Sequence, residues 1–374
     1  MFNRSFKTNF SNYKHRKVTS VYPLQLVQDK QQPIRFLNLA LMSNKILEIK
    51  NLKTEFKSDN HSIKAVNDIS FSINEGEIVG VVGESGSGKS VTSLSVMGLI
   101  PSPPGKITKG EILFLKSDGT TVDTTKLNPE GLRKIRGNEI SMIFQEPMTS
   151  LNPVFTCGDQ VTESIILHQK ISKQEAKIKT IELFNKVELP RPDAIFNQYP
   201  HQLSGGQKQR VMIAMAISCS PKLLIADEPT TALDVTIQAQ VINLMKDIIK
   251  EFNMGVIFIT HDLGVIAQVA DDVAVMYLGS VVEQGPVNEI IKNPMHPYTR
   301  GLINALPDIN NLDAPLTPIP GNIPSPLDRP SGCVIRTRCR HASQEGKEAD
   351  IKMGLVEVKP GHWLDNCGVN CGKV

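Results

Sequence analysis

The sequence has no long hydrophobic run. No stretch approaches about 18 uninterrupted apolar residues, because Asp, Glu, Lys or Gly breaks the longest candidates. A membrane-spanning helix needs about 20 predominantly apolar residues. The sequence therefore predicts that the chain does not cross a membrane by itself, and that any role at a membrane goes through partner subunits.

Cysteine and aromatic residues are also scarce. The 374 residues include six cysteines, and aromatic residues make up 5% of the chain. So few cysteines in a chain of this length do not suggest a disulfide framework. The hydrophobic fraction of 40% and the charged fraction of 21% are ordinary for soluble globular proteins, and the length allows two or three domains.

A strong net charge is absent from the body of the chain. Residues 1–41 carry seven Lys or Arg against one acid, Asp29, which leaves 34 basic and 37 acidic residues elsewhere, a net charge of −3. This balance does not favour nucleic acid as a partner. The basic leader lacks the apolar segment of a signal peptide, and Met42 directly precedes the first regular segment. Residues 1–41 are therefore predicted to be a misassigned start or a disordered arm.

A glycine-rich segment at residues 83–90 is the most informative feature that is present. It reads Gly-Glu-Ser-Gly-Ser-Gly-Lys-Ser, it follows a β-like run at residues 77–82, and a helix is predicted after it. This order of strand, glycine loop and helix is the context that a P-loop requires. Lys89 is then expected to reach the β and γ phosphates of a nucleotide, and the Ser90 hydroxyl to meet Mg²⁺.

Two adjacent acids follow a second apolar run. Residues 223–226 are Leu-Leu-Ile-Ala, and Asp227 and Glu228 come next, at the mouth of a predicted strand where open sheets bind ligands. Asp227 is predicted to hold Mg²⁺, and Glu228 to orient or deprotonate the water that attacks the γ-phosphate. A solvated acidic turn is the alternative, which the upstream P-loop and the following Pro-Thr-Thr-Ala-Leu-Asp segment, ending at Asp234, disfavour.

Polar residues end two more predicted strands. His261 and Gln145 each come after an apolar run, and the carboxyl ends of parallel strands meet at one edge of a sheet. We expect His261 to contact the γ-phosphate and Gln145 to ligate Mg²⁺ or position water. A lone histidine after an apolar strand is more often structural, but the expected neighbourhood of the Asp227 strand favours the functional role. Phe56 could stack on the nucleotide base or be an ordinary core residue.

A second segment suited to phosphate lies at residues 203–207. Ser204, Gly205 and Gly206 stand at the start of a predicted helix, whose N–H groups and positive dipole end can bind a phosphate. One chain does not need two such cradles for one nucleotide, so we expect this segment to serve the nucleotide of a facing subunit. Apolar residues at helical spacing predict an inserted helical subdomain over about residues 150–205.

Taken together, these motifs resemble the nucleotide-binding subunits of ABC transporters. The resemblance implies an α/β fold over residues 42–300: a P-loop NTPase ABC cassette with a RecA-like core, an antiparallel β subdomain and a helical signature subdomain. It also implies a head-to-tail dimer with two ATP molecules between P-loop and signature. The motifs are the Walker A motif at residues 83–90, the Q-loop at Gln145, the signature at residues 203–207, the Walker B motif at residues 223–228, the D-loop ending at Asp234 and the switch histidine His261.

The resemblance assigns roles to individual residues of this chain. The predicted ATP-binding residues are Phe56, Gly83, Glu84, Ser85, Gly86, Ser87, Gly88, Lys89, Ser90 and Val91. The predicted catalytic residues are Lys89, Gln145, Glu228 and His261, and the predicted Mg²⁺ ligands are Ser90, Gln145 and Asp227. The residues expected to act on the partner's ATP are Leu203, Ser204, Gly205, Gly206 and Gln207. Asp234 is assigned to the D-loop.

A narrower resemblance is to the D-type ATPases of dipeptide and oligopeptide importers. It implies ATP-driven import of di- or oligopeptides through two integral-membrane permeases, supplied by an external peptide-binding protein. A second, F-type ATPase subunit would complete the dimer on the cytoplasmic face of the bacterial inner membrane, where the chain would be peripheral. The segments that carry it are residues 83–92, 97–105, 145–153, 199–207, 293–299 and 330–339.

Three alternative functions remain open at this point. Close relatives of this family import nickel or other small solutes. A soluble ABC ATPase acting on nucleic acid is disfavoured by the single cassette, the absence of a heptad run and the slightly acidic body. A regulatory cassette that does not hydrolyse ATP is disfavoured by Glu228 and His261.

Cysteines crowd the predicted C-terminal extension, residues 301–374. Relatives carry four cysteines here that can hold a [4Fe–4S] cluster; tetrahedral Zn²⁺ or no metal are the alternatives. This chain departs from that pattern, since a cysteine expected soon after Cys339 is absent and Cys371 lies beyond the usual last ligand. His362 and Trp363 are expected to pack rather than to ligate. The candidate ligands are Cys333, Cys339, Cys367 and Cys371.

Overall fold

The computed structural model of the chain describes most of it from Lys45 onwards. The basic leader predicted for residues 1–41 lies outside the described residues. Among the residues that are described, no helix is long and apolar enough to cross a membrane. The described ranges are residues 45–58, 61–145, 150–231, 233–306, 318–339 and 354–365.

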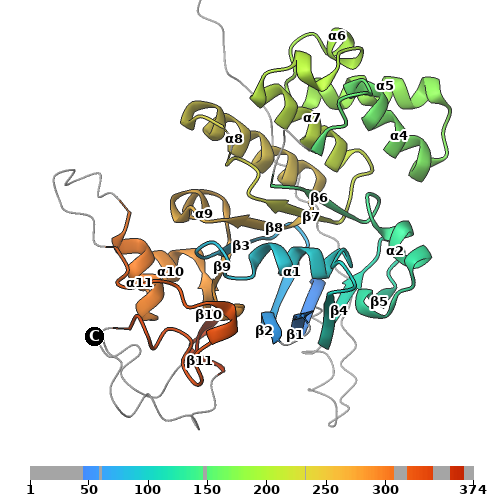
Figure 1. Cartoon of the computed structure of the whole chain (residues 1–374). Coiled ribbons are helices and arrows are strands. Elements are labelled where there is room, and N and C mark those ends of the chain that lie inside the picture. Colours follow the sequence, from blue (N-terminus) through green and yellow to red (C-terminus); the bar gives the residue numbers. More distant parts are fainter. Residues whose placement is uncertain are drawn as a thin grey trace, which may run out of the picture. The chain divides into compact units, whose positions relative to one another are not determined.

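A small antiparallel sheet precedes and flanks the P-loop. Within the described ranges it has four strands in the order β2-β1-β4-β5 (Figure 1). Buried and exposed residues alternate along much of β1 and β2, as expected of strands that cover a core with one face. This sheet is the predicted antiparallel β subdomain. The strands are β1 (Lys45–Ser58), β2 (His61–Asn74), β4 (Gly105–Leu115) and β5 (Thr121–Asp123).

A larger sheet contains the strands at whose ends the motif residues lie. Its described strands run in the order β11-β12-β10-β9-β3-β8-β7-β6, and the pairs β9-β3, β3-β8, β8-β7 and β7-β6 are parallel. The prediction that the His261 strand adjoins the Asp227 strand is confirmed, since β8 pairs with β7. The parallel strands are β3 (Ile78–Val82), β6 (Ile140–Ile143), β7 (Leu223–Asp227), β8 (Gly255–Thr260) and β9 (Asp272–Tyr277).

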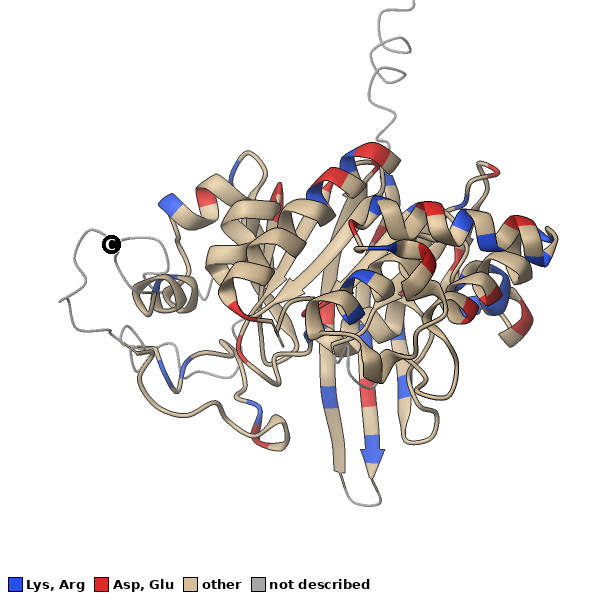
Figure 2. Ribbon diagram, turned by 90° about the horizontal axis from the view of Figure 1, so that it is seen from above, with Lys and Arg blue, Asp and Glu red and all other residues tan. Residues whose placement is uncertain are grey.

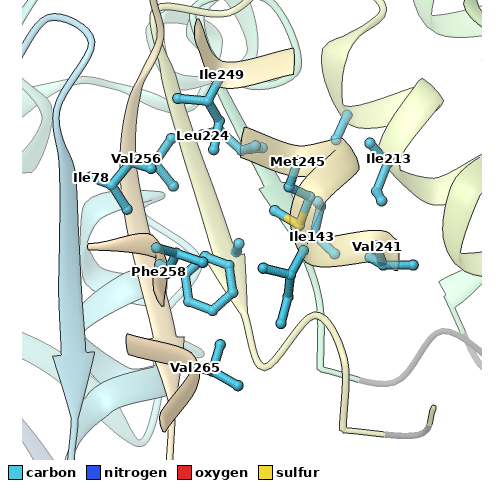
Figure 3. Packing of buried hydrophobic residues seen from close by; sticks show 14 of the residues in the cluster. Ile78, Ile143, Ile213, Leu224, Val241, Met245, Ile249, Val256, Phe258 and Val265 are labelled. Atoms are coloured by element: carbon cyan, nitrogen blue, oxygen red, sulfur yellow. The ribbon is translucent and has the colours of Figure 1, made fainter. Parts of the chain in front are cut away.

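Both faces of the parallel sheet are covered. Along β7 and β8, alternate residues enter two different cores: Leu224 and Phe258 join one, and Ile225 and Ile257 join the other. Figure 3 shows part of the first core, which includes Met245 and Ile249 of α8 together with Leu224 and Phe258. The second core includes the antiparallel sheet and α1. The helices next to the strands are α1 (Lys89–Val96), α8 (Val235–Phe252) and α9 (Leu263–Val269).

A cluster of helices lies together in Figure 1, between the Q-loop and β7 in sequence. Its close packing needs a small residue at Gly158, because a Cβ there would lie 2.3 Å from the ring of Phe196. Ser172 and Glu175 form a capping box that starts α5. The helices are α4 (Cys157–Gln169), α5 (Lys173–Lys186), α6 (Pro192–Phe196) and α7 (Gly205–Ile217), with α2 (Pro129–Ile135) before them and the short turn η2 (Pro200–Gln202) before α7.

The C-terminal part of the chain adds strands to the large sheet. The hairpin of β11 and β12 joins it through antiparallel pairing of β12 with β10. Charged residues of both signs are interspersed over the described elements (Figure 2). The elements are β10 (Ser280–Pro286), α10 (Val287–Lys292), α11 (Pro297–Asn304), η3 (Pro326–Asp328), β11 (Leu355–Lys359) and β12 (His362–Asp365).

A buried polar network holds this hairpin in place. Glu283 and His362 are both fully buried, and His362 Nε2 lies 2.8 Å from Glu283 Oε1. Glu283 also accepts the backbone N–H groups of Met295 at 2.7 Å and His296 at 3.0 Å. One carboxylate thus accepts from the buried groups of His296 and His362 and from the half-buried N–H of Met295. His362 is buried and a carboxylate holds its ring, whereas Trp363, also expected to pack, is 38% exposed.

The variant Glu283→Gln is expected to lower the free energy of unfolding by about 2 kcal/mol or more, because the amide NH₂ would face a backbone N–H in a buried site. Thermal unfolding followed by circular dichroism would measure the loss. Glu289→Gln is the matched control, since Glu289 makes an exposed ion pair with Lys359 in the same region. Equal melting temperatures for both variants would contradict the expectation.

Candidate active site

The P-loop joins β3 to α1 and wraps the amino end of that helix. Gly88 precedes α1 with a φ of 98°, and a Cβ there would lie 2.4 Å from the carbonyl oxygen of Ala65, so glycine is required. Lys89 is 5% exposed, and its Nζ donates to the carbonyl oxygens of Gly83 at 2.8 Å and Glu84 at 3.1 Å. Burial lowers the pKa of Lys89, although the carboxylates around it oppose the shift.

Asp227 ends β7 inside the same site. Its side chain is buried, and Oδ1 has no hydrogen-bond partner. Burial raises the pKa of Asp227, and the Ser90 hydroxyl and Lys89 act in the opposite direction. A buried carboxylate oxygen without a partner is a place where a ligand is expected. Ser87 Oγ in the P-loop is also buried without a partner.

Glu228 follows with an unusual backbone conformation. Its φ is 48°, a left-handed value that is uncommon outside glycine and occurs often at functional sites. Its N–H donates to Ile259 of β8 at 2.9 Å, so the neighbouring strand fixes the turn. The Thr231 hydroxyl donates to Glu228 Oε2 at 2.9 Å. This conformation directs the carboxylate to the strand-end edge of the sheet.

Gln145 and His261 converge on Glu228. Gln145 Nε2 donates to Glu228 Oε2 at 3.2 Å, and His261 Nδ1 lies 3.3 Å from Glu228 Oε1. Burial raises the pKa of Glu228, but hydrogen bonds from Thr231 and His261 outweigh it, so the pKa is lowered overall. The ends of β6, β7 and β8 therefore meet at one carboxylate that stays ionised near neutral pH.

A cavity of about 190 Å³ is lined by both Gln145 and Glu228 and by the P-loop, whereas Asp227 and His261 are not part of its described lining. Its described lining includes residues 85–91, Gln145 and Glu228. A larger cavity of about 980 Å³ lies between the antiparallel sheet and the C-terminal part. The larger cavity contains none of the strand-end polar residues, so the smaller one is the candidate site.

Phe56 is absent from the described lining of the smaller cavity. It pairs with Ile63 across β1 and β2, and its ring lies against Gly105, where a Cβ would be 2.8 Å from Cε1. Stacking of Phe56 on adenine stays a prediction. The predicted site residues do not include Pro326 and Arg329, which line the cavity from the C-terminal part. No motif marks them, so only their place in the fold identifies them.

The donor set fits a magnesium nucleotide. Backbone N–H groups at the start of α1, the Lys89 ammonium and the partnerless Ser87 hydroxyl suit phosphate oxygens. The hydroxyl of Ser90 and the free oxygen of Asp227 are oxygen ligands of the kind that Mg²⁺ prefers.

The signature segment lies at the start of α7, apart from this chain's own cavity. None of residues 203–207, all of them described, lines it. Ser204 caps α7: its Oγ accepts Gln207 N–H at 3.3 Å, and Gln207 Oε1 accepts Ser204 N–H at 3.0 Å. Gly205 is exposed, and its nearest neighbour for a Cβ is at 4.0 Å. This first turn is therefore open to a group from outside the chain.

The D-loop residue Asp234 has a capping role in the structure. Its Oδ1 accepts Ile237 N–H at 3.0 Å at the start of α8. Val235 beside it is 83% exposed, an unusual state for a large apolar side chain. The assignment of Asp234 to a D-loop stays a prediction.

The predicted cysteine site is described only in part. Cys333 is buried and Cys339 half-buried, whereas Cys367 and Cys371 lie outside the described residues. In the part of the chain that the structure describes, no group of three or more His, Cys, Asp or Glu is placed to hold a metal ion. The structure thus gives no support to a [4Fe–4S] cluster, and the four-cysteine site stays a prediction.

Two families match different parts of the sequence. Residues 66–231 match the family described as ABC transporter. Residues 282–345 match the family described as oligopeptide/dipeptide transporter, C-terminal region. The first match contains the P-loop, Gln145, the signature and Glu228, and the second contains Glu283, Arg329 and much of the region around them.

Curated relatives cover most of the described chain. The oligopeptide transport ATP-binding protein AppD of Bacillus subtilis is 52% identical over 79% of this chain and 89% of its own length. OppD of the same organism, also an oligopeptide transport ATP-binding protein, is 50% identical over 86% of this chain and 88% of its own length. The dipeptide transport ATP-binding protein DppD, also of Bacillus subtilis, is 48% identical over 79% of this chain and 87% of its own length.

Solved structures resemble the fold. A dimeric post-hydrolysis state of the ATP-binding cassette MJ0796, bound to ADP and Pi, matches with a TM-score of 0.57 and 30% identity, over 64% of this chain and 98% of that one. CbiO1 from Clostridium perfringens, part of the ABC transporter complex cbiONQ, matches with a TM-score of 0.56 and 27% identity, over 67% of this chain and 92% of that one. The cassette fold predicted from the motifs is therefore confirmed.

Proposed function

The chain belongs to the ATP-binding subunits of oligopeptide and dipeptide ABC transporters, and from this premise we propose how its own residues drive the transport cycle. It is an ABC-type ATPase, and its hydrolysis of ATP energises peptide import. The alternatives of nickel uptake and of a soluble cassette acting on nucleic acid are not favoured, because the relatives named above transport peptides.

The convergence of Gln145 and His261 on Glu228 is the observation that carries the proposal. Glu228 is the general base: its ionised carboxylate accepts a proton from the attacking water. His261 and Gln145 hold that carboxylate and would orient the water and the γ-phosphate.

Lys89 and the P-loop N–H groups would bind the β and γ phosphates. In the structure Lys89 donates to two P-loop carbonyls, and it would exchange these partners for phosphate oxygens when ATP binds. Ser90 and Asp227 would hold Mg²⁺, which, when bound, neutralises charge that develops on the phosphates.

Cassettes of this kind work in pairs and act through permeases. We propose that the exposed start of α7 completes the nucleotide site of a facing F-type subunit. Two integral-membrane permeases and an external peptide-binding protein would complete the importer. The chain would then lie peripherally on the cytoplasmic face of the bacterial inner membrane.

The peptide assignment is tested on the complex in liposomes, co-expressed from the neighbouring genes. ATPase activity would be measured with binding protein alone and with binding protein loaded with di- or oligopeptides. We expect stimulation by the peptide-loaded form, because the loaded receptor is the signal for the permeases to switch. Robust activity that ignores every peptide would keep the cassette chemistry and overturn the peptide substrate.

A further inference from the structure

The C-terminal region reaches back to the P-loop and grips one residue of it. We propose that Arg338 and Tyr298 are positioning residues for ATP, which hold the P-loop through the side chain and the backbone of Glu84. This inference rests on the proposed function, because it assumes that ATP binds at residues 83–90. It gives the C-terminal region a role in ATP binding, through residues that lie outside the cassette motifs.

The first contact is an ion pair with two hydrogen bonds. Arg338 Nη1 donates to Glu84 Oε2 at 2.7 Å, and Nη2 donates to Oε1 at 3.2 Å. The side chain of Arg338 is 4% exposed and that of Glu84 is 27% exposed. Two-pronged pairs of this kind are strong and fix geometry. The residues are 254 positions apart in the sequence.

The second contact holds the backbone of the same residue. The N–H of Glu84 donates to the Tyr298 hydroxyl at 2.9 Å. Tyr298 is fully buried, and its ring centroid lies 4.7 Å from that of Tyr277. Packing therefore fixes the hydroxyl in place. Glu84 is therefore held by two residues, Arg338 and Tyr298, and neither of them belongs to a cassette motif.

Both holding residues are themselves anchored. Arg338 Nε donates to the carbonyl oxygen of Pro320 at 3.0 Å, and its guanidinium lies 5.8 Å from the ring centroid of Tyr277. These partners already hold the Arg338 side chain in position, so pairing with Glu84 costs little further side-chain entropy.

Tyr298 is anchored through the polar network around Glu283. Its N–H donates to His296 Nδ1 at 3.2 Å. Burial lowers the pKa of His296 to about 3, so the ring is neutral and Nδ1 can accept. The N–H of His296 donates to Glu283, which also holds His362 of β12. A continuous series of hydrogen bonds thus joins β12 to the P-loop.

Glu84 is a sensitive point because its carbonyl oxygen also accepts from Lys89. The N–H and the carbonyl oxygen of Glu84 belong to the two peptide units on either side of its Cα, so the position of this one residue affects where the loop N–H groups and Lys89 stand before phosphate binds. If the grip is lost, ATP has to order the loop itself, and that ordering reduces affinity. Glu228, Gln145 and His261 stand on other strands, so the chemical step should change little. The expected signature is a raised KM with kcat nearly unchanged.

The test uses the full-length chain in its reconstituted complex, with ATP as the varied substrate. Arg338→Ala is expected to raise the KM for ATP about tenfold, with kcat within about twofold of the unsubstituted complex. Arg338→Lys should recover part of the loss, because an ammonium group can keep one of the two bonds. Arg336→Ala is the matched control: Arg336 donates to Ser331 and not to the P-loop, and it should leave KM unchanged.

A second variant separates positioning from folding. Tyr298→Phe keeps the buried ring and removes only the hydroxyl, so it should raise KM in the same direction as Arg338→Ala. The double variant Glu84→Ala/Arg338→Ala should be no worse than the worse single variant, because both remove one interaction. Affinity for trinitrophenyl-ATP, measured without turnover, should fall in parallel with the rise in KM.

The outcomes distinguish this inference from the proposed function. If Arg338→Ala and Tyr298→Phe keep the unsubstituted KM while Lys89→Ala loses activity, the positioning role is wrong and the ATPase assignment stands. A fall in kcat at constant KM would also overturn it, since that pattern indicates a structural role. If Lys89→Ala hydrolyses ATP normally, the proposed nucleotide site itself fails.

Discussion

Glu228→Gln is expected to lower the ATPase rate of the complex by about 100-fold or more, because general-base catalysis contributes roughly 10²–10⁴ in rate. The amide keeps the shape of the side chain and its contacts with Thr231 and Gln145, but it cannot take a proton from water. ATP binding should persist, since the P-loop is untouched. Steady-state phosphate release and binding of trinitrophenyl-ATP would measure the two effects separately.

The control for this variant is Glu130→Gln on α2. Glu130 is an exposed carboxylate that pairs with Lys134 one helical turn away, so its loss should leave hydrolysis unchanged. An unchanged ATPase rate in Glu228→Gln would show that Glu228 is not the general base. Loss of nucleotide binding in the same variant would show that Glu228 acts on affinity and not on the chemical step.

Lys89→Ala is expected to weaken ATP binding by about 100-fold or more and to abolish measurable hydrolysis at micromolar ATP, because truncating one partner of a buried charge pair costs about 2–5 kcal/mol. Lys89 is buried and lines the cavity at the P-loop. Its carbonyl partners in the loop would also lose their donor. Titration with trinitrophenyl-ATP would give the change in dissociation constant.

Lys134→Ala is the matched control for the lysine variant. Lys134 is exposed, lies on α2 and pairs only with Glu130 among the described contacts. Its removal takes away the same charge without touching the cavity, so affinity should not change. An equal loss of affinity in both variants would mean that the effect comes from net charge and not from the P-loop.

The local parts of the site could be predicted from the sequence. Glycines at fixed spacing between an apolar run and a helix identify a P-loop, and α1 starts at Lys89 as expected. Apolar runs that end in Gln145, Asp227 and His261 predicted strand ends at one edge, and the parallel pairing of β6, β7 and β8 puts them there. These predictions succeed because backbone conformation and strand direction act over a few residues.

The environment of Phe56 shows where local reasoning is insufficient. A single aromatic residue upstream of a P-loop has no periodicity that says which neighbour it meets. In the structure it lies against Gly105 of β4, and the described cavity lining on that side comes from Ile63, Lys64 and Ala65. Which side chain faces the cavity depends on the register of β1 and β2, including its bulges.

The sequence by itself determined the cassette, the order of its motifs and the chemistry of each motif, because these depend on short segments whose residue types set backbone shape and charge. Only the tertiary structure decided that β12 joins β10 and that Arg338 and Tyr298 hold Glu84. The two contacts with Glu84 join residues more than two hundred positions apart, and the strand pairing joins residues about 80 positions apart. Burial and packing of the whole chain select such partners, and no local pattern in the sequence encodes them.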